Sequence, residues 1–287
     1  METTAGSGAS VHAIIRASIH TFLKNYPYFN ALTILVLLPY SALILLSRMR
    51  MVTTTLSILG LEMMPATTMV LQVAFTLTFL VMAKSEVIRC LGKHPQDQMF
   101  PSFFRPYVGL LKTQIWNSVL AITVSSTVSV LFSIAHQLSS TLKGFPSAGT
   151  MLFPILQAAI FYLIMINLSA INNISLVISG NDNCSPAVAI SKACKLRKRE
   201  PGILVTAALS NLGFTGVEAL FRYRVITDHR SPGMPSSCGM IWEIFLISYM
   251  YSVVIILDMV ACCLFLKRRS TEDHEEDEGD DAGYHVV

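Results

Sequence analysis

Asp258 is the residue whose position could do chemistry, because it lies inside a long apolar segment, residues 240–266. A central Asp in a membrane-spanning helix costs about 2.5–3.5 kcal/mol on insertion scales. A facing polar partner, a water-filled cavity or protonation must compensate for that cost. The candidate partners are four amides in two other apolar segments: Asn167, Asn172, Asn173 and Asn211.

Two interpretations of this polar set remain open. In the first, Asp258 and the amides form a pathway for an ion or a small solute. In the second, they form a hydrogen-bonded contact between helices, as Asn and Ser often do in membranes. The sequence favours the contact, because no second carboxylate lies at a similar depth. Glu218 and Glu243 are nearer the outer ends of their segments.

The six cysteines predict no metal site and no disulfide, since the spacing of Cys184 and Cys194 differs from that of zinc-binding pairs. Cys262 and Cys263 precede the basic run 267–269, a position that suits S-palmitoylation. The alternative is that they are two small apolar residues of a helix.

The sequence contains none of the common catalytic motifs. A Gly-rich phosphate loop, an ordered Ser/His/Asp set and an HExxH run are all missing. We therefore expect no catalytic residues, no cofactor, no metal and no enzymatic activity.

The elements that must position these residues are six long apolar segments. Charged residues make up 14% of the 287 residues, against about 25% in soluble domains. Each bilayer crossing needs about 20 apolar residues in a helix. We predict an all-α bundle of about six transmembrane helices, because a spanning strand would alternate polar and apolar residues. The segments are 30–47, 66–83, 115–135, 150–179, 202–221 and 240–266.

Charge sets the predicted orientation, since Lys and Arg concentrate on cytoplasmic loops. With six crossings and a cytoplasmic N-terminus, 15 of the 21 Lys and Arg residues lie on the cytoplasmic side. We therefore predict an integral protein of the endomembranes or the plasma membrane with both termini in the cytoplasm.

Two cytoplasmic amphipathic helices are predicted at residues 11–23 and 185–199. In the first, an apolar face and a basic face run side by side; the apolar set is Val11, Ile14, Ile15, Ile19, Phe22 and Leu23. Such a helix lies in the membrane interface or packs on the cytoplasmic ends of the bundle. In the second, Ser185 is the predicted N-cap and Pro186 the first helical residue. The predicted contacts to lipid phosphates are Arg16, Lys24, Lys192, Lys195, Arg197, Lys198 and Arg199.

Three parts follow along the chain: an amphipathic segment at 1–29, a six-helix transmembrane domain at 30–269 and an acidic tail at 270–287. The tail has eight acids in the ten residues 272–281, so we expect it to be disordered and to bind a cytoplasmic protein partner. Membrane lipids are the other expected partners, and nucleic acid is not one. Small residues on one face of the third segment predict core packing or a contact in a homo-oligomer: Ser118, Ala121, Ser125 and Ser129.

Two stretches carry a family resemblance. Residues 16–25 (RASIHTFLKN) with 37–41 (LLPYS), and residues 174–178 (ISLVI) with 187–196 (AVAISKACKL), resemble a plant multi-pass membrane protein family of unknown function. The layout is also distantly similar to bacterial six-helix membrane domains fused to phosphodiester hydrolases. The chain departs from the plant family at 180–183 (GNDN), where a Glu-rich turn is usual. The resemblance implies a six-helix fold and no established activity.

Three functions are therefore in play. The favoured hypothesis is a non-enzymatic protein that organises partners or trafficking at a membrane. The alternative is a transporter or channel that uses Asp258 and the intramembrane amides. An enzyme acting on lipid ranks last, because the sequence offers neither an acid/base pair nor a set of metal ligands.

Overall fold

The structure is a computed structural model that describes the backbone of residues 3–56, 66–92, 104–141, 147–182, 184–230 and 237–281. Side chains are described over 11–47, 73–92, 107–135, 137–138, 155–182, 184–224 and 242–269. Every regular element in these ranges is a helix, which confirms the predicted all-α class.

The helices follow one another with short connections. Their bounds are α1 Thr3–Lys24, α2 Tyr26–Leu32, the π-helix η1 Thr33–Leu37, α3 Leu38–Leu56, α4 Ala66–Leu91, α5 Phe104–Thr141, α6 Ser147–Asp182, α7 Pro186–Arg199, α8 Gly202–Arg230 and α9 Ser237–Asp281.

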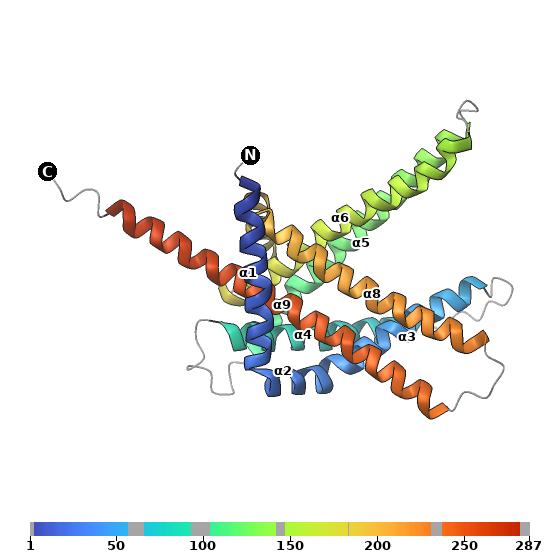
Figure 1. Cartoon of the computed structure of the whole chain (residues 1–287), viewed down its shortest axis with the longest axis horizontal. Coiled ribbons are helices and arrows are strands. Elements are labelled where there is room, and N and C mark those ends of the chain that lie inside the picture. The colour runs from blue at the N-terminus through green and yellow to red at the C-terminus, as the bar shows by residue number, and fades with distance from the viewer. Residues whose placement is uncertain are drawn as a thin grey trace.

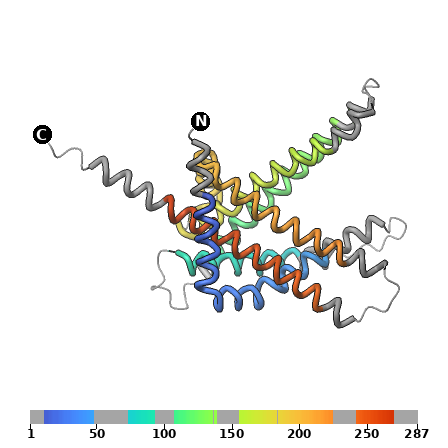
Figure 2. The backbone as a smooth tube through the Cα atoms, viewed as in Figure 1, coloured from blue at the N-terminus to red at the C-terminus, as the bar shows by residue number. Residues whose placement is uncertain are grey.

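Helices that are neighbours in sequence form antiparallel pairs, α5 with α6 and α8 with α9 (Figure 1). The α5/α6 pair diverges from the other long helices, whereas α1 runs across them. The tube in Figure 2 shows the same divergence of the α5/α6 pair from the other long helices. Helix α9 packs against α1, α3, α4, α6 and α8, so it is the centre of the fold.

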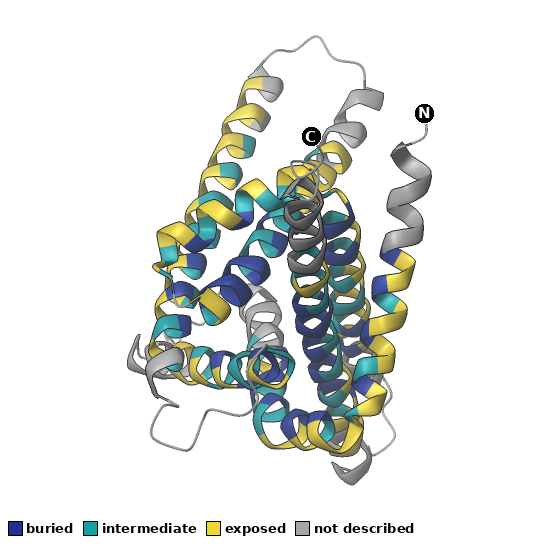
Figure 3. Cartoon of the chain, turned by 90° about the vertical axis from the view of Figure 1, so that its left-hand side faces the viewer, coloured by how far each residue is buried: buried dark blue, intermediate teal, exposed yellow. Residues whose placement is uncertain are grey.

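The main core lies along α9, with contributions from α2, α3 and α4. Its fully buried residues include Phe29, Leu45, Val81 and Ile256. Exposed residues cover much of the outward surface of the helices (Figure 3). Large apolar side chains are prominent among them, which suits helices that face lipid acyl chains rather than water.

Five described helices are long and apolar enough to cross a membrane: Tyr26–Ser47, Tyr107–Ala135, Ile155–Asp182, Gly202–Arg224 and Trp242–Arg269. They correspond to five of the six predicted segments. The predicted crossing at 66–83 begins where side chains are not described, and the described part of α4 carries Lys84, Glu86 and Arg89. A sixth crossing through α4 therefore stays a prediction.

Pro39 acts on the backbone before it. Because proline has no N–H, it cannot donate to the carbonyl of Leu35. The preceding turn widens into η1, where the backbone N–H of Leu38 donates to the carbonyl of Thr33. Ser41, on the next turn, donates to the Ser248 carbonyl at 2.8 Å and lies 2.9 Å from the Ser252 hydroxyl. These contacts join α3 to α9.

Both predicted amphipathic segments are helices, α1 and α7. Ser185 has the extended backbone of an N-cap and Pro186 is the first helical residue, as predicted. The Ser185 side chain, however, makes no capping hydrogen bond.

The buried face of α1 is narrower than predicted. Val11, Ile14 and Phe22 are buried, as expected, but Ile19 is 48% exposed and Leu23 is 61% exposed. Ser18 is buried instead, because its hydroxyl donates to the Ile14 carbonyl at 2.8 Å and so needs no partner outside the helix.

The tail was predicted to be disordered from residue 270, but the structure continues α9 as a helix to Asp281. Extending an existing helix costs little, since each added residue gains a backbone hydrogen bond without a new nucleus. The tail's side chains and the partner expected for them lie outside the described residues.

Candidate functional site

Asp258 lies on the face of α9 that looks into the bundle, between the core residues Ile255 and Met259. Its side chain is buried, and only 7% of the residue is exposed. Since α9 is surrounded by α4, α6 and α8, these helices supply its neighbours.

The amide of Asn173 on α6 bridges two charged groups. Its Nδ2 donates to Asp258 Oδ2 at 2.5 Å, and its Oδ1 accepts from Lys84 Nζ at 2.9 Å. Ser210 of α8 lies close to the Asp258 carboxyl. This orientation of the amide suits an ionised carboxylate on one side and a protonated amine on the other. Side chains from α4, α6 and α9 therefore meet in one polar unit, which we call the Lys–Asn–Asp chain (Lys84, Asn173 and Asp258).

The other predicted amides lie elsewhere. Asn167 donates to Leu163 in its own helix and accepts from Arg197 of α7. The backbone carbonyl of Asn172, rather than its side chain, accepts from the Asn117 amide of α5 at 3.1 Å. Asn211 donates to the Ala207 carbonyl at 2.8 Å, within α8. Of the four predicted amides, the structure brings Asn173 to Asp258.

The predicted crossing 66–83 ends directly before Lys84, so the sequence predicts a loop from Lys84 onward, and this prediction was wrong. The structure places Lys84 on α4, half-buried, with its amine on Asn173. A lysine that directly follows an apolar run is usually the end of a crossing, but α4 continues for seven more residues to Leu91. An available signal was the continued helical pattern of apolar residues beyond it, Val87, Ile88 and Leu91.

A second polar cluster joins α5 to α6. Asn117 Nδ2 donates to Ser175 Oγ at 3.0 Å, and Thr113 and Ser179 share a hydrogen bond of 2.8 Å one turn away. All four side chains are buried. These bonds satisfy polar groups that lipid could not satisfy, so they act as contacts between helices.

The predicted small-residue face of α5 is only partly covered. Ser118, Ala121 and Ser125 are half-buried, while Ser129 is exposed. The packing interpretation therefore suits the first part of this face, and an oligomer contact stays a prediction.

The predicted lipid contacts divide into two groups. Lys192 donates to Asp182 at 2.8 Å, and this hydrogen bond raises the pKa of the Lys192 ammonium. Arg197 donates a hydrogen bond to the Asn167 side chain. The remaining five are exposed: Arg16, Lys24, Lys195, Lys198 and Arg199.

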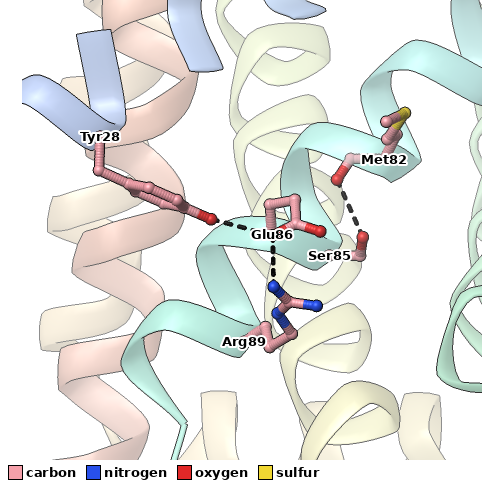
Figure 4. Close-up of polar contacts among 5 residues, drawn as sticks. All are labelled: Tyr28, Met82, Ser85, Glu86 and Arg89. Carbon is pink, nitrogen blue, oxygen red and sulfur yellow. Dashed lines mark hydrogen bonds and ion pairs between the residues drawn. The ribbon is translucent and has the colours of Figure 1, made fainter. Parts of the chain in front are cut away.

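A third cluster ties α2 to α4 near the bend between α1 and α2 (Figure 4). Tyr28 donates to Glu86 Oε2 at 2.9 Å, and Arg89 lies 3.6 Å from the same oxygen. Tyr26 and Tyr28 are both partly exposed here. Tyrosines with one polar end are enriched where a membrane helix meets water, so this cluster is typical of a membrane–water interface.

The two candidate acylation sites face inward. Cys263 is buried in the main core, and Cys262 is partly buried against it. An acyl chain on either sulfur would have to leave between packed helices. Palmitoylation stays a prediction. Among the described residues, no group of three or more His, Cys, Asp or Glu side chains is placed to hold a metal ion.

Comparison with protein-family models, with curated proteins and with solved structures gives no match to this chain.

Proposed function

We propose that this chain is a multi-pass membrane protein without enzymatic activity that organises partners or trafficking at a membrane, with both termini in the cytoplasm. The observation that carries the proposal is a division of its polar groups. Several of those inside the bundle bond to one another, whereas exposed cations lie on the two amphipathic helices α1 and α7.

The interior groups hold helices together. The Lys–Asn–Asp chain joins α4, α6 and α9, and the Asn117 cluster joins α5 to α6. Each hydrogen bond that links two membrane helices is worth about 0.6–2 kcal/mol. Several of them would fix the relative positions of the crossings, as a protein that presents fixed surfaces to partners requires.

Several helix ends that are predicted to lie on the cytoplasmic side are close to one another. A Cβ on Gly180, near the end of α6, would lie 3.1 Å from Ile88 of α4 and 3.3 Å from Leu110 of α5. Glu200, after α7, pairs with Arg269 of α9 at 3.2 Å. A Cβ on Gly202, at the start of α8, would lie 3.2 Å from Val11 of α1. The start of α8 therefore lies close to both the part of α1 around Val11 and the basic end of α9, as expected for one cytoplasmic surface.

The proposal agrees with the resemblance to plant six-helix membrane proteins of unknown function. That resemblance implies the same architecture and brings no activity.

An affinity pull-down in mild detergent tests the proposal, with three chains compared. They are the intact protein, a chain ending at Arg269, and a full-length chain whose eight tail acids are replaced by Asn or Gln. We expect cytoplasmic partners on the intact protein that are lost from both variants. A partner set shared equally by all three chains, or none on the intact protein, would contradict a tail-based organising role.

The second candidate function is a transporter or channel, and the position of Lys84 favours it. An ionisable residue within a membrane is a candidate functional site, and here a Lys and an Asp share one amide. The test is ion flux in proteoliposomes, beginning with protons, for the intact protein, Asp258→Asn and Asn211→Ala as control. Flux lost in Asp258→Asn alone would support transport. Equal flux in a folded Asp258→Asn protein would sink it.

A further inference from the structure

Helix α1 carries three parallel bands of side chains, each one residue further along the sequence than the last. The buried band contains Ile14, Ser18 and Phe22, which pack into the protein. The apolar band contains Ile15, Ile19 and Leu23, of which the last two are exposed. The basic band contains Arg16, His20 and Lys24, all exposed. Because consecutive residues are rotated by about 100° around a helix, the three bands occupy successive faces.

This order is what a helix needs when it lies at a membrane surface beside a protein. One face packs on the protein, the next reaches toward acyl chains, and the third meets the headgroups. A helix in water would have no use for Ile19 and Leu23 on a face that the protein leaves uncovered. A helix packed wholly on the bundle would bury them.

The position of α1 agrees with this reading. It runs across the long helices rather than along them (Figure 1), and it packs on α8 and α9. At its end, Phe22 stacks on Phe29 with ring centroids 5.7 Å apart, and the exposed Tyr26 lies between them in sequence. The chain then enters the apolar span Tyr26–Ser47. The bend at Asn25 therefore separates α1 from this apolar span.

We infer that α1 lies in the headgroup region and binds anionic phospholipids of the leaflet on its side of the membrane. Arg16 and Lys24 contact the phosphates, while Ile19 and Leu23 enter the acyl boundary. The inference rests on the proposed membrane location but not on the partner-organising role, so each can fail without the other.

Tryptophan quenching tests the apolar band. The full chain is reconstituted in nanodiscs with acyl-brominated lipid, in a Trp116→Phe/Trp242→Phe background that removes the two native tryptophans. Leu23→Trp should be strongly quenched. Ala17→Trp, on an exposed face of the same helix beyond the basic band, is the matched control and should be quenched much less. Ile19→Trp replaces Leu23→Trp if that variant fails to fold.

Lipid retention tests the basic band. Native mass spectrometry of the full chain from nanodiscs of mixed phosphatidylcholine and phosphatidylserine should show preferential retention of phosphatidylserine. Arg16→Gln/Lys24→Gln should reduce that preference by about fivefold per cation, the factor expected for a basic residue at an anionic surface. Arg222→Gln, at an exposed position of α8, is the matched control and should leave the preference unchanged.

Two results would overturn the inference. Quenching at position 23 as weak as that at position 17 would mean that the apolar band does not face lipid, as when a second copy or another protein covers it. An unchanged phosphatidylserine preference in a folded Arg16→Gln/Lys24→Gln protein would mean that the basic band does not bind phosphates.

Discussion

Asp258 is tolerated within α9 because the amide of Asn173 separates its carboxylate from the Lys84 amine while bonding to both. An amide can donate to an anion and accept from a cation at the same time, so one neutral side chain satisfies two charges. The arrangement also spans three helices, which makes Asn173 the residue on which the other two depend.

Replacing Asn173 should therefore be costly. We expect Asn173→Leu to destabilise the protein by about 3–5 kcal/mol, because it leaves buried charged groups without their polar partner. Asn211→Leu is the control, since Asn211 bonds within its own helix. Thermal unfolding in detergent should show a large fall in Tm for the first variant and a small one for the second. Equal falls in Tm would show that the hydrogen bonds of Asn173 to Lys84 and Asp258 stabilise the protein no more than the bond of Asn211 within its own helix.

The charges at the two ends of the Lys–Asn–Asp chain, on Lys84 and Asp258, should be energetically coupled. Lys84→Met and Asp258→Leu should each destabilise strongly, because each leaves an uncompensated charge in the bundle. The double variant removes both charges and should recover much of that loss. The measurement is a double-mutant cycle of unfolding midpoints in detergent. Purely additive losses would mean that Lys84 and Asp258 do not interact through Asn173.

At this scale the sequence predicted two of the three residues in the Lys–Asn–Asp chain. Asp258 and Asn173 could be named because polar residues inside apolar runs are rare and need partners. Lys84 was missed because a basic residue directly after an apolar run usually ends a crossing, although apolar residues continue the helical pattern beyond it. The choice of Asn173 over Asn172 depends on the rotation of α6, which the sequence pattern does not fix.

At the scale of elements, α5 depends on few polar contacts. Much of its surface is exposed, with Ile122, Val130 and Ile134 among its outward residues. Inside a membrane, apolar contact with a neighbouring helix offers little advantage over contact with lipid. The bonds that α5 makes to α6 through Thr113 and Asn117 therefore carry much of its specificity.

We accordingly expect Asn117→Leu to loosen α5 from α6. The loss should be about 0.6–2 kcal/mol, the range for a hydrogen bond between membrane helices. Hydrogen exchange of the α5 amides in nanodiscs should increase, together with a modest fall in Tm. Thr123→Val is the matched control, because Thr123 donates to Val119 in its own exposed turn. Similar exchange in both variants would argue against a special role for Asn117.

The elements themselves were largely predictable, and their packing faces were not. Long apolar runs and Ser-Pro at 185–186 predicted the crossings and α7, since length and capping chemistry are written locally. In α1, two neighbouring bands are both apolar, and the sequence cannot say which of them meets protein. The missing N–H of Pro39 disturbs the helix before it, but the form of that disturbance, a π-helix, depends on how the surrounding helices pack.

At the scale of the whole molecule, the uneven distribution of cations along the sequence and the contacts between helix ends indicate the same grouping of segments on one side of the bundle. The turn that contains Glu200 and Gly202 touches both α9 and α1, so the beginning of the chain, the connection to α8 and the basic end of α9 share one region. The sequence predicted this grouping through charge alone. It could not predict that the α5/α6 pair diverges from the other helices (Figure 1), because divergence depends on contacts far apart in the chain.

The predicted orientation can be checked by glycosylation mapping in a eukaryotic membrane. Asn183 begins a native acceptor tripeptide, Asn183-Cys184-Ser185, in the connection between α6 and α7. We expect it to remain unmodified, because that connection is predicted to face the cytoplasm. An acceptor built into a lengthened 231–236 connection should be modified, because that connection lies at the other end of α8 and α9. The measurement is a glycosidase-sensitive mobility shift, with Asn183→Gln as the background control. A mobility shift that disappears with Asn183→Gln would show that the orientation is the reverse of the predicted one. The exposed cations of α1 and α7 would then lie at the lumenal or outer leaflet.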